Sequence, residues 1–237
     1  MGRASVDDFP GTGNAPLALH SPVAEVALWW KTLTAGDDEF AQLSSWLAPQ
    51  EHARVARFAR DDLKRRYIVG RATLRWVLGR SLGVAPADVR IVRGERGRPH
   101  LDGDATIDFN ISHTAGVSLI GLTTSGRIGV DVERLERHVS ADGLAKKFLT
   151  IGERSTLSGL DEGARRRRFL RYWTCKEAMS KATGDGLSAP FRRLDVRLED
   201  AMALVDGPAP YEPTRWRLHA VAVADGYLAT VALWSPA

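Results

Sequence analysis

The clearest pattern in the chain is an alternation of apolar and polar residues over positions 127–133, which predicts a β-strand. The apolar positions of this strand are Ile128, Val130 and Val132. Residues two apart in a strand project from the same face, so the carboxylates of Asp131 and Glu133 are expected side by side. Two carboxylates this close repel each other, and a divalent cation such as Mg²⁺ relieves the repulsion. A half-exposed strand with a solvated acidic face is the alternative interpretation of the same alternation.

A second informative segment is the helical stretch Trp173-Thr-Cys-Lys-Glu-Ala-Met-Ser-Lys181. Within it, Glu177 and Lys181 are four residues apart and lie on neighbouring turns of the helix. Lys176 precedes Glu177 directly, so a carboxylate stands between two ammonium groups. A third carboxylate for a metal ion, flanked by cations for phosphate, is the composition expected of a site that binds a diphosphate ester.

Apolar residues at three- and four-residue steps predict one long helix from His52 to Leu82, which Gly83-Val-Ala-Pro86 is expected to end. A helix start is predicted just before it, at Leu47-Ala-Pro-Gln-Glu51, and a short helix over Phe40–Trp46. Residues 1–20 have the composition of a loop and are predicted to form a mobile arm. Further strands are predicted over Glu25–Trp30, Val89–Val92, Ile107–Ile111, Val117–Leu122, Leu194–Leu198, Trp216–Val223 and Tyr227–Trp234.

The second half of the chain repeats the order of features of the first. Glu153 follows Glu51 by 102 positions (153 − 51), and Leu149 follows Leu47 by the same offset. Such a duplication predicts an α+β fold of two similar lobes packed as an intramolecular pseudo-dimer. The N-terminal lobe is predicted over 21–126 and the C-terminal lobe over 127–237. Because ligand sites favour seams between lobes, the active site is expected there.

The composition is that of an ordinary globular protein, with 44% hydrophobic and 26% charged residues in 237. Cys175 is the only cysteine, which excludes a disulfide framework and a thiolate metal site. The formal net charge of +4 fits acidic partners, such as a polyphosphate ligand or an acidic protein. A nucleic-acid-binding protein is disfavoured, because the charge comes without a helix-turn-helix, zinc or RNA-binding signature. With no apolar run near the ~18 residues of a membrane span and no signal-peptide pattern, a cytoplasmic protein is expected.

Three short motifs follow one another in a fixed order: Asn110-Ile-Ser-His113, Gly129-Val-Asp-Val-Glu133 and the helix that ends at Lys181. Together they resemble the 4′-phosphopantetheinyl transferases of the larger, surfactin-synthetase-activating type. The resemblance covers about Leu47 to Leu198, and this chain reads Lys-Glu-Ala where other members read Lys-Glu-Ser. It implies two similar α+β lobes and Mg²⁺ as cofactor, and a monomer is expected because the seam of the pseudo-dimer is already internal to the chain. It also implies transfer of the phosphopantetheine arm of coenzyme A to a serine of an apo acyl or peptidyl carrier protein, with release of 3′,5′-ADP.

The resemblance implies roles for individual residues as well. Three acids would hold Mg²⁺ against the diphosphate of coenzyme A: Asp131, Glu133 and Glu177. The residues implied in binding coenzyme A are Arg66, Arg98, Pro99, Ser112, His113, Lys176 and Lys181. Arg66 would contact the 3′-phosphate, Arg98 and Pro99 would line the adenine side, and Lys181 would point at the diphosphate. Glu153 and Lys181 are the implied catalytic residues, Glu153 as general base for the serine hydroxyl and Lys181 beside the departing 3′,5′-ADP.

Some of these residues have structural alternatives that the sequence leaves open. Glu153 can equally be an acid that the helix macrodipole favours at a helix start, as Glu51 is in the other copy. Ser112 can be a cap or turn residue and His113 a turn histidine. The run of four arginines at 165–168 is either a solvated helix face or a docking patch for an acidic carrier. The pathway that the carrier serves, whether polyketide, nonribosomal peptide or fatty acid synthesis, is left open.

Overall fold

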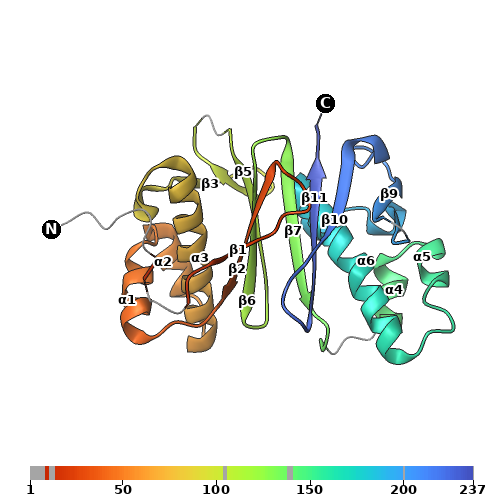
Figure 1. Cartoon of the computed structure of the whole chain (residues 1–237), viewed down its shortest axis with the longest axis horizontal. Coiled ribbons are helices and arrows are strands. Elements are labelled where there is room, and N and C mark those ends of the chain that lie inside the picture. Colours follow the sequence, from red (N-terminus) through yellow and green to blue (C-terminus); the bar gives the residue numbers. More distant parts are fainter. Residues whose placement is uncertain (1–8, 11–13, 104–105, 138–140, 200, 237) are drawn as a thin grey trace.

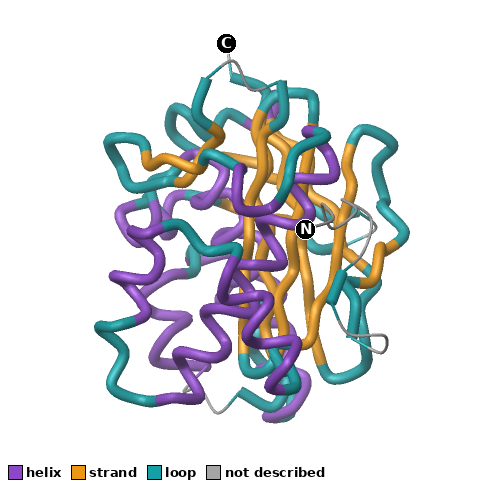
Figure 2. Tube along the Cα trace, turned by 90° about the vertical axis from the view of Figure 1, so that its left-hand side faces the viewer, coloured by secondary structure: helices purple, strands orange, loops and turns teal. Residues whose placement is uncertain are grey.

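The computed structural model describes residues 9–10, 14–103, 106–137, 141–199 and 201–236. Its two larger sheets are antiparallel and lie next to each other in the middle of the molecule, with a group of helices outside each (Figure 1). Viewed from one end, the helices of the N-terminal half form a layer in front of the strands (Figure 2). The predicted α+β class is therefore confirmed.

The N-terminal sheet has the strand order β1-β2-β6-β5, and all neighbouring strands are antiparallel. Its strands are β1 (Leu17–Leu19), β2 (Val26–Thr32), β5 (Asp108–Thr114) and β6 (Val117–Thr123). Every residue of β6 is buried, since helix α3 (Asp61–Leu82) packs on one face of the sheet and the second sheet on the other. The lack of apolar–polar alternation in β6 is therefore that of a strand covered on both faces.

The C-terminal sheet has the order β10-β11-β7, again antiparallel, with helix α6 (Glu162–Thr183) packed against β7 and β11. Its strands are β7 (Arg127–Arg134), β10 (Trp216–Val221) and β11 (Tyr227–Trp234). The apolar positions of β7 face the core between the two sheets, and its polar positions face α6. Asp131 and Glu133 are both buried, which excludes the alternative of a solvated acidic face.

The remaining helices and strands are short. They are α1 (Asp37–Ser45), α2 (Pro49–Val55), β3 (Ile91–Arg93), β4 (Pro99–Leu101), α4 (Ala141–Phe148), α5 (Ile151–Ser155), β8 (Asp195–Arg197) and β9 (Ala203–Asp206). Strands β3 and β4 form a hairpin of their own, as do β8 and β9. Within the described ranges, the helices include none with the length and apolarity needed to cross a lipid bilayer.

The two lobes repeat one arrangement around a buried glutamate. α3 and α6 are both 22 residues long, and each ends at a glycine with a left-handed backbone. In each lobe a short helix, α2 or α5, precedes the long one and carries a buried glutamate in its first turn. Glu51 pairs with Arg75 of α3 at 2.6 Å, and Glu153 pairs with Lys176 of α6 at 2.6 Å. The same contact at the same place in both halves supports the internal duplication.

The two sheets meet along β5 and β7, between which the described residues form no backbone ladder. Alternate side chains of β5 instead accept hydrogen bonds from backbone N–H groups of β7. The three bonds run from Ile128 to Asp108 Oδ2 (2.8 Å), from Val130 to Asn110 Oδ1 (3.0 Å) and from Val132 to Ser112 Oγ (3.3 Å). Gly121 of β6 lets the sheets approach, because a Cβ there would lie 2.7 Å from Val130 Cγ1. These contacts fix the register of one lobe against the other.

Two predictions about the N-terminal half need correction. The predicted mobile arm contains strand β1, which pairs with β2; residues 1–8 and 11–13 lie outside the described residues. The single helix predicted from His52 is wrong, because residues 56–60 separate α2 from α3. The break lets α2 fold back onto α3, where Glu51 reaches both Arg71 and Arg75.

Candidate active site

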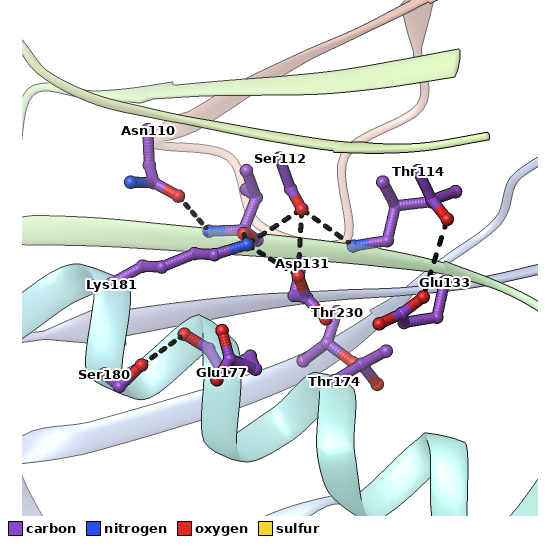
Figure 3. Close-up of polar contacts among 12 residues, drawn as sticks. Asn110, Ser112, Thr114, Asp131, Glu133, Thr174, Glu177, Ser180, Lys181 and Thr230 are labelled. Carbon is purple, nitrogen blue, oxygen red and sulfur yellow. Dashed lines mark hydrogen bonds and ion pairs between the residues drawn. The ribbon is translucent and has the colours of Figure 1, made fainter. Parts of the chain in front are cut away.

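Three carboxylates converge between β7 and α6. Asp131 and Glu133 project from β7, and Glu177 projects from α6 toward them (Figure 3). Gly129 makes this approach possible, because a Cβ at that position would lie 1.8 Å from the carbonyl oxygen of Ala178 on α6. The glycine at the start of the Gly-Val-Asp-Val-Glu motif therefore seats the helix that carries the third acid.

The charges of these acids are incompletely compensated. Burial raises the pKa of Glu177; Lys181 opposes the rise, and the charges of Asp131 and Glu133 add to it. Burial also raises the pKa of Glu133, with a further contribution from Asp131. Asp131 Oδ2 and Glu177 Oε1 are buried and lack a hydrogen-bond partner among the described residues. Buried carboxylate oxygens without partners are costly, so the site favours an added cation.

Two side-chain cations contact the acids in this structure. Lys181 Nζ lies 2.6 Å from Asp131 Oδ1 and donates to Ser112 Oγ at 2.8 Å (Figure 3). Arg137 pairs with Glu133, whose Oε1 also accepts a bond from Trp173 Nε1 at 3.1 Å. With these pairs in place, no three Asp, Glu, His or Cys side chains in the described residues are arranged to hold a metal ion. The donor set nevertheless fits a hard divalent ion, since its oxygens are carboxylates and two of them are unpartnered.

A cavity of about 460 Å³ lies beside the acids. Its wall includes six arginines, namely Arg54, Arg66, Arg71, Arg93, Arg96 and Arg98. Lys181 and His113 add two further basic groups, and the lining found among the described residues contains no aspartate or glutamate. The aromatic rings of Phe58 and Tyr67 and the ring of Pro99 supply apolar surface. A cavity of this size and charge fits a polyanionic ligand with an aromatic part.

Ser112 and His113 project to opposite sides of β5. Ser112 is buried at the seam, where its hydroxyl contacts Asp131 Oδ1 at 2.8 Å and accepts a bond from the backbone of Val132. It is neither a turn residue nor a helix cap. His113 lines the cavity, and desolvation together with the nearby Lys181 lowers the pKa of its imidazole. The two residues therefore link the carboxylates to the arginine-lined cavity.

The structure does not fit the role implied for Lys176. Its ammonium group is fully buried and donates to Glu153 Oε2 at 2.6 Å and to the carbonyl oxygens of Phe148 and Phe191. All three ammonium hydrogens are thus used within the C-terminal lobe, and none is available to a phosphate. Successive helix residues are rotated by about 100°, which places Lys176 on a different face from Glu177.

Glu153 is occupied in the same way. One carboxylate oxygen accepts from the backbone N–H of Thr150 and from Lys176, and the other accepts from the backbone N–H of Val196 at 3.0 Å. The residue is 2% exposed and forms a capping box with Thr150. Of the two roles that the sequence left open for Glu153, this geometry supports the structural one at the start of α5 and does not support a general base.

Arg66 and Arg98 both line the cavity but differ in their freedom. Arg66 is largely exposed and makes one long contact of 3.6 Å with Asp62. Arg98 is half-buried, with two parallel bonds to Asp108 of 2.8 and 2.7 Å and a bond from Nε to the carbonyl oxygen of Lys181. The guanidinium of Arg98 therefore ties the lobes together, and Arg66 remains able to meet a ligand.

Several residues of the site were given no role in the sequence analysis, although Asn110 belongs to the first of its three motifs. They are Arg54, Arg71, Arg93, Arg96, Asp108 and Asn110. A signal existed for the last two, because polar residues at positions 108, 110, 112 and 114 recur every second residue along β5. The arginines come from α2, α3, the end of β3 and the loop between β3 and β4, and only the fold brings them together.

Comparisons with known proteins agree with this architecture. Residues 127–232 match the family model of the 4′-phosphopantetheinyl transferase superfamily, and residues 30–123 match that of the 4′-phosphopantetheinyl transferase N-terminal region. The chain is 33% identical over 225 residues to the 4′-phosphopantetheinyl transferase HetI of Nostoc sp., a match that covers 90% of each chain. It is 29% identical over 177 residues to the 4′-phosphopantetheinyl transferase Sfp of Bacillus subtilis, covering 74% of this chain and 78% of that one.

Among solved structures, a holo-(acyl-carrier-protein) synthase from Bacillus anthracis in complex with CoA (3′,5′-ADP) is 25% identical. That match covers 46% of this chain and 96% of the other, with a TM-score of 0.36. The relation to HetI extends over nine-tenths of both chains, and the two family models match in succession on either side of residues 124–126. The chain therefore belongs to the 4′-phosphopantetheinyl transferases, the enzymes that move the phosphopantetheine arm of coenzyme A onto a serine of a carrier protein.

Proposed function

We propose that this chain uses Mg²⁺, held by Asp131, Glu133 and Glu177, to transfer the phosphopantetheine arm of coenzyme A to an apo acyl or peptidyl carrier protein. The observation that carries the proposal is the contrast between two adjacent spaces. One holds the buried carboxylates of Asp131 and Glu133 and the half-buried carboxylate of Glu177, with two unpartnered buried oxygens, and the other is walled by six arginines. A diphosphate ester with a bound divalent ion satisfies both, because the ion meets the acids and the phosphates meet the arginines.

The charge and the shape of the arginine-lined cavity support one orientation of coenzyme A. Its 3′,5′-ADP half would lie in the cavity, with the 3′-phosphate near Arg66 and the base beside Pro99. The diphosphate would lie between His113 and Lys181, at the end of the cavity nearest the acids. Bound Mg²⁺ would supply charge neutralisation at the diphosphate oxygens. The pantetheine arm would then leave the cavity toward the carrier.

The transfer step asks for one bond to form and one to break. The serine oxygen of the carrier attacks the phosphorus that bears the pantetheine arm, and the bond from this phosphorus to the oxygen of the 5′-phosphate of 3′,5′-ADP breaks. Lys181 would neutralise charge on the departing phosphate. Glu153 is committed to Lys176, so the serine proton would pass to the carboxylate oxygen of Glu177 that does not hold the ion.

The test is incubation of the protein with coenzyme A, Mg²⁺ and an apo carrier domain, followed by intact mass measurement. The expected result is a carrier that gains the mass of one phosphopantetheine group, and a Glu177→Gln variant that forms this product at least 100-fold more slowly. Glu162→Gln is the matched control, because Glu162 is an exposed residue at the start of the same helix. If the carrier stays unmodified, or if Glu177→Gln and Glu162→Gln retain equal rates, the proposal is wrong.

We further propose that the protein acts as a monomer. Each lobe already buries a sheet face against the other, so the seam that two separate chains would form is internal to this one. Light scattering after size-exclusion chromatography should give a mass near 26.0 kDa. A mass of twice that value, independent of protein concentration, would contradict this part of the proposal.

A further inference from the structure

The loop that joins β3 to β4 belongs to the N-terminal lobe but reaches the C-terminal lobe at the end of α6. Residues 93 and 96–99 of this hairpin line the arginine cavity from one side, and residues 180, 181, 184 and 186 line it from the other. Two arginines of the loop, Arg96 and Arg98, cross between the lobes. Their surroundings differ in a way that assigns them different tasks.

Arg98 holds the β3–β4 loop against both lobes through several hydrogen bonds. It is 9% exposed, and its donors contact Asp108, the carbonyl oxygen of Ile128 and the carbonyl oxygen of Lys181. Gly184 lies directly beneath it, since a Cβ at that glycine would be 3.2 Å from the Cβ of Arg98. A ligand would have to break several buried bonds to recruit this guanidinium.

Arg96 is attached much more weakly. Its side chain is 70% exposed, and one of its nitrogens, Nη1, pairs with Asp185 just beyond α6. An ion pair with one partner so exposed contributes at most about 1 kcal/mol, because solvent screens the attraction. Arg96 also lines the cavity, so a phosphate group there can attract it at little cost.

Asp185 is held in place and cannot follow Arg96. Its Oδ2 accepts hydrogen bonds from the hydroxyl of Tyr211 at 2.6 Å and from that of Thr183 at 2.9 Å. Tyr211 is fully buried and stacks on Trp216, with 5.4 Å between the ring centroids. If Arg96 turned toward a phosphate, Asp185 would therefore remain at the rim of the cavity as a negative charge without its cation.

We propose that Arg96 is a further phosphate-binding residue of the transferase, shared between the ligand and Asp185, and that Asp185 weakens the hold of the cavity on 3′,5′-ADP. The inference rests on the proposed placement of 3′,5′-ADP in the arginine cavity. Arg71 and Arg98 are held by Glu51 and Asp108, but the other four arginines of the cavity would still bind a product with two phosphate groups tightly, and a tightly bound product limits turnover. Asp185 competes with the phosphates for one of these arginines and so speeds product release.

The test is the binding of 3′,5′-ADP to the full chain without a carrier, measured by calorimetry and, for dissociation, by stopped-flow. The variants are Asp185→Asn, Arg96→Gln and the double variant. Asp185→Asn keeps an oxygen for the hydroxyl of Tyr211 and frees Arg96. It should tighten binding by up to about fivefold and slow dissociation, the factor that corresponds to an ion pair of this exposure. Arg96→Gln should weaken binding by a similar factor.

The double variant and a control separate this inference from its rivals. If Asp185 acts through Arg96, the double variant should bind as Arg96→Gln does. If Asp185 repels the ligand only through the general field of its charge, Asp185→Asn should tighten binding equally in the wild-type and in the Arg96→Gln protein, and the inference is wrong. If the ion pair merely braces the loop, Asp185→Asn weakens binding, which also overturns it. Asp102→Asn removes the same charge from the far end of the hairpin, at the exposed pair with Arg90, and should leave binding within about twofold.

The outcome for the unaltered protein is informative separately. If the wild-type chain does not bind 3′,5′-ADP, both the placement of the coenzyme and this inference fail. If it binds, and Asp185→Asn binds no more tightly, only the role assigned to Arg96 and Asp185 fails. The melting temperature of each variant should stay within a few degrees of the wild-type value, since the pair is largely exposed on the arginine side.

Discussion

Replacement of Glu153 by glutamine separates a structural role from a catalytic one. The carboxylate accepts bonds from Lys176 at 2.6 Å and from the backbone N–H groups of Thr150 and Val196 at 2.8 and 3.0 Å. Burial raises the pKa of Glu153 and lowers that of Lys176, and their mutual attraction offsets both effects. A glutamine keeps one acceptor oxygen but leaves the ammonium group of Lys176 buried without a counter-charge.

The expected loss of stability is about 3 kcal/mol, at the lower end of the range for breaking a buried pair, because two carbonyl oxygens still accept bonds from Lys176. In a chain of this length that loss lowers the melting temperature by roughly 6–12 °C. Urea unfolding followed by tryptophan fluorescence measures the stability, and arm transfer per native molecule at low temperature measures the activity. The transfer rate of Glu153→Gln should stay within about threefold of the wild-type rate, because Glu153 touches no part of the cavity lining.

Two further variants make this prediction sharper. Glu51→Gln removes the equivalent carboxylate of the N-terminal lobe, which pairs with Arg71 and Arg75, and should cost a similar free energy. Adding Lys176→Met to Glu153→Gln should restore part of the stability, because no unpaired charge then remains buried. A Glu153→Gln protein with the wild-type unfolding midpoint and a rate reduced by about 100-fold would refute this reasoning and favour a general base.

Three other predictions concern the pKa of Glu177, the close contact of Gly129 with helix α6, and the two arginines Arg66 and Arg98. The raised pKa of Glu177 means that the folded state holds its proton more tightly than the unfolded chain. The contribution of Glu177 to the stability of the metal-free protein should therefore be complete below the ordinary value of 4.5 and be lost as the pH rises through the raised value, so that the stability of the wild-type protein relative to Glu177→Gln falls in urea titrations from pH 4.5 to 8. Gly129→Ala places a Cβ 1.8 Å from the carbonyl oxygen of Ala178, so soluble expression and urea unfolding should show a loss of several kcal/mol. Arg66→Gln should weaken coenzyme A binding about tenfold in calorimetry without changing the melting temperature, whereas Arg98→Gln should lower the melting temperature.

Each of these predictions has a control or a contradicting outcome. A stability difference between the metal-free wild-type protein and Glu177→Gln that does not fall between pH 4.5 and 8 would contradict the raised pKa of Glu177. Gly36→Ala is the control for Gly129→Ala, because a Cβ at position 36 meets no atom within 4 Å. Equal melting temperatures for Arg66→Gln and Arg98→Gln would contradict the different tasks assigned to the two arginines.

The sequence predicted the parts of the site that lie within single elements. The alternation in β7 placed Asp131 and Glu133 on one face, and the four-residue spacing on α6 placed Glu177 near Lys181. The structure shows the same arrangement, with both acids of β7 facing α6 (Figure 3). Local periodicity is sufficient here because each pair belongs to one strand or one helix.

Contacts between distant elements could not be predicted in the same way. Lys176 precedes Glu177 in the chain, but the rotation of about 100° per helix residue turns it toward α5 and away from the acids. The arginine cavity draws residues from α2, α3 and the β3–β4 loop, and no spacing rule joins these three segments. Strand β1 escaped prediction because three residues are too few to show an alternation.

The bonds from β7 to the side chains of β5 have a consequence for how coenzyme A enters. Sliding β7 by one residue along β5 would leave three buried backbone N–H groups without acceptors. Rotating the lobes apart would expose the apolar core between the sheets. The two halves are thus held in one register, and with coenzyme A placed as proposed, we expect the exposed part of the β3–β4 loop to be what moves when the nucleotide enters. Enzyme variants with altered coenzyme preference should therefore be sought in that part of the loop and not along the interlobe joint.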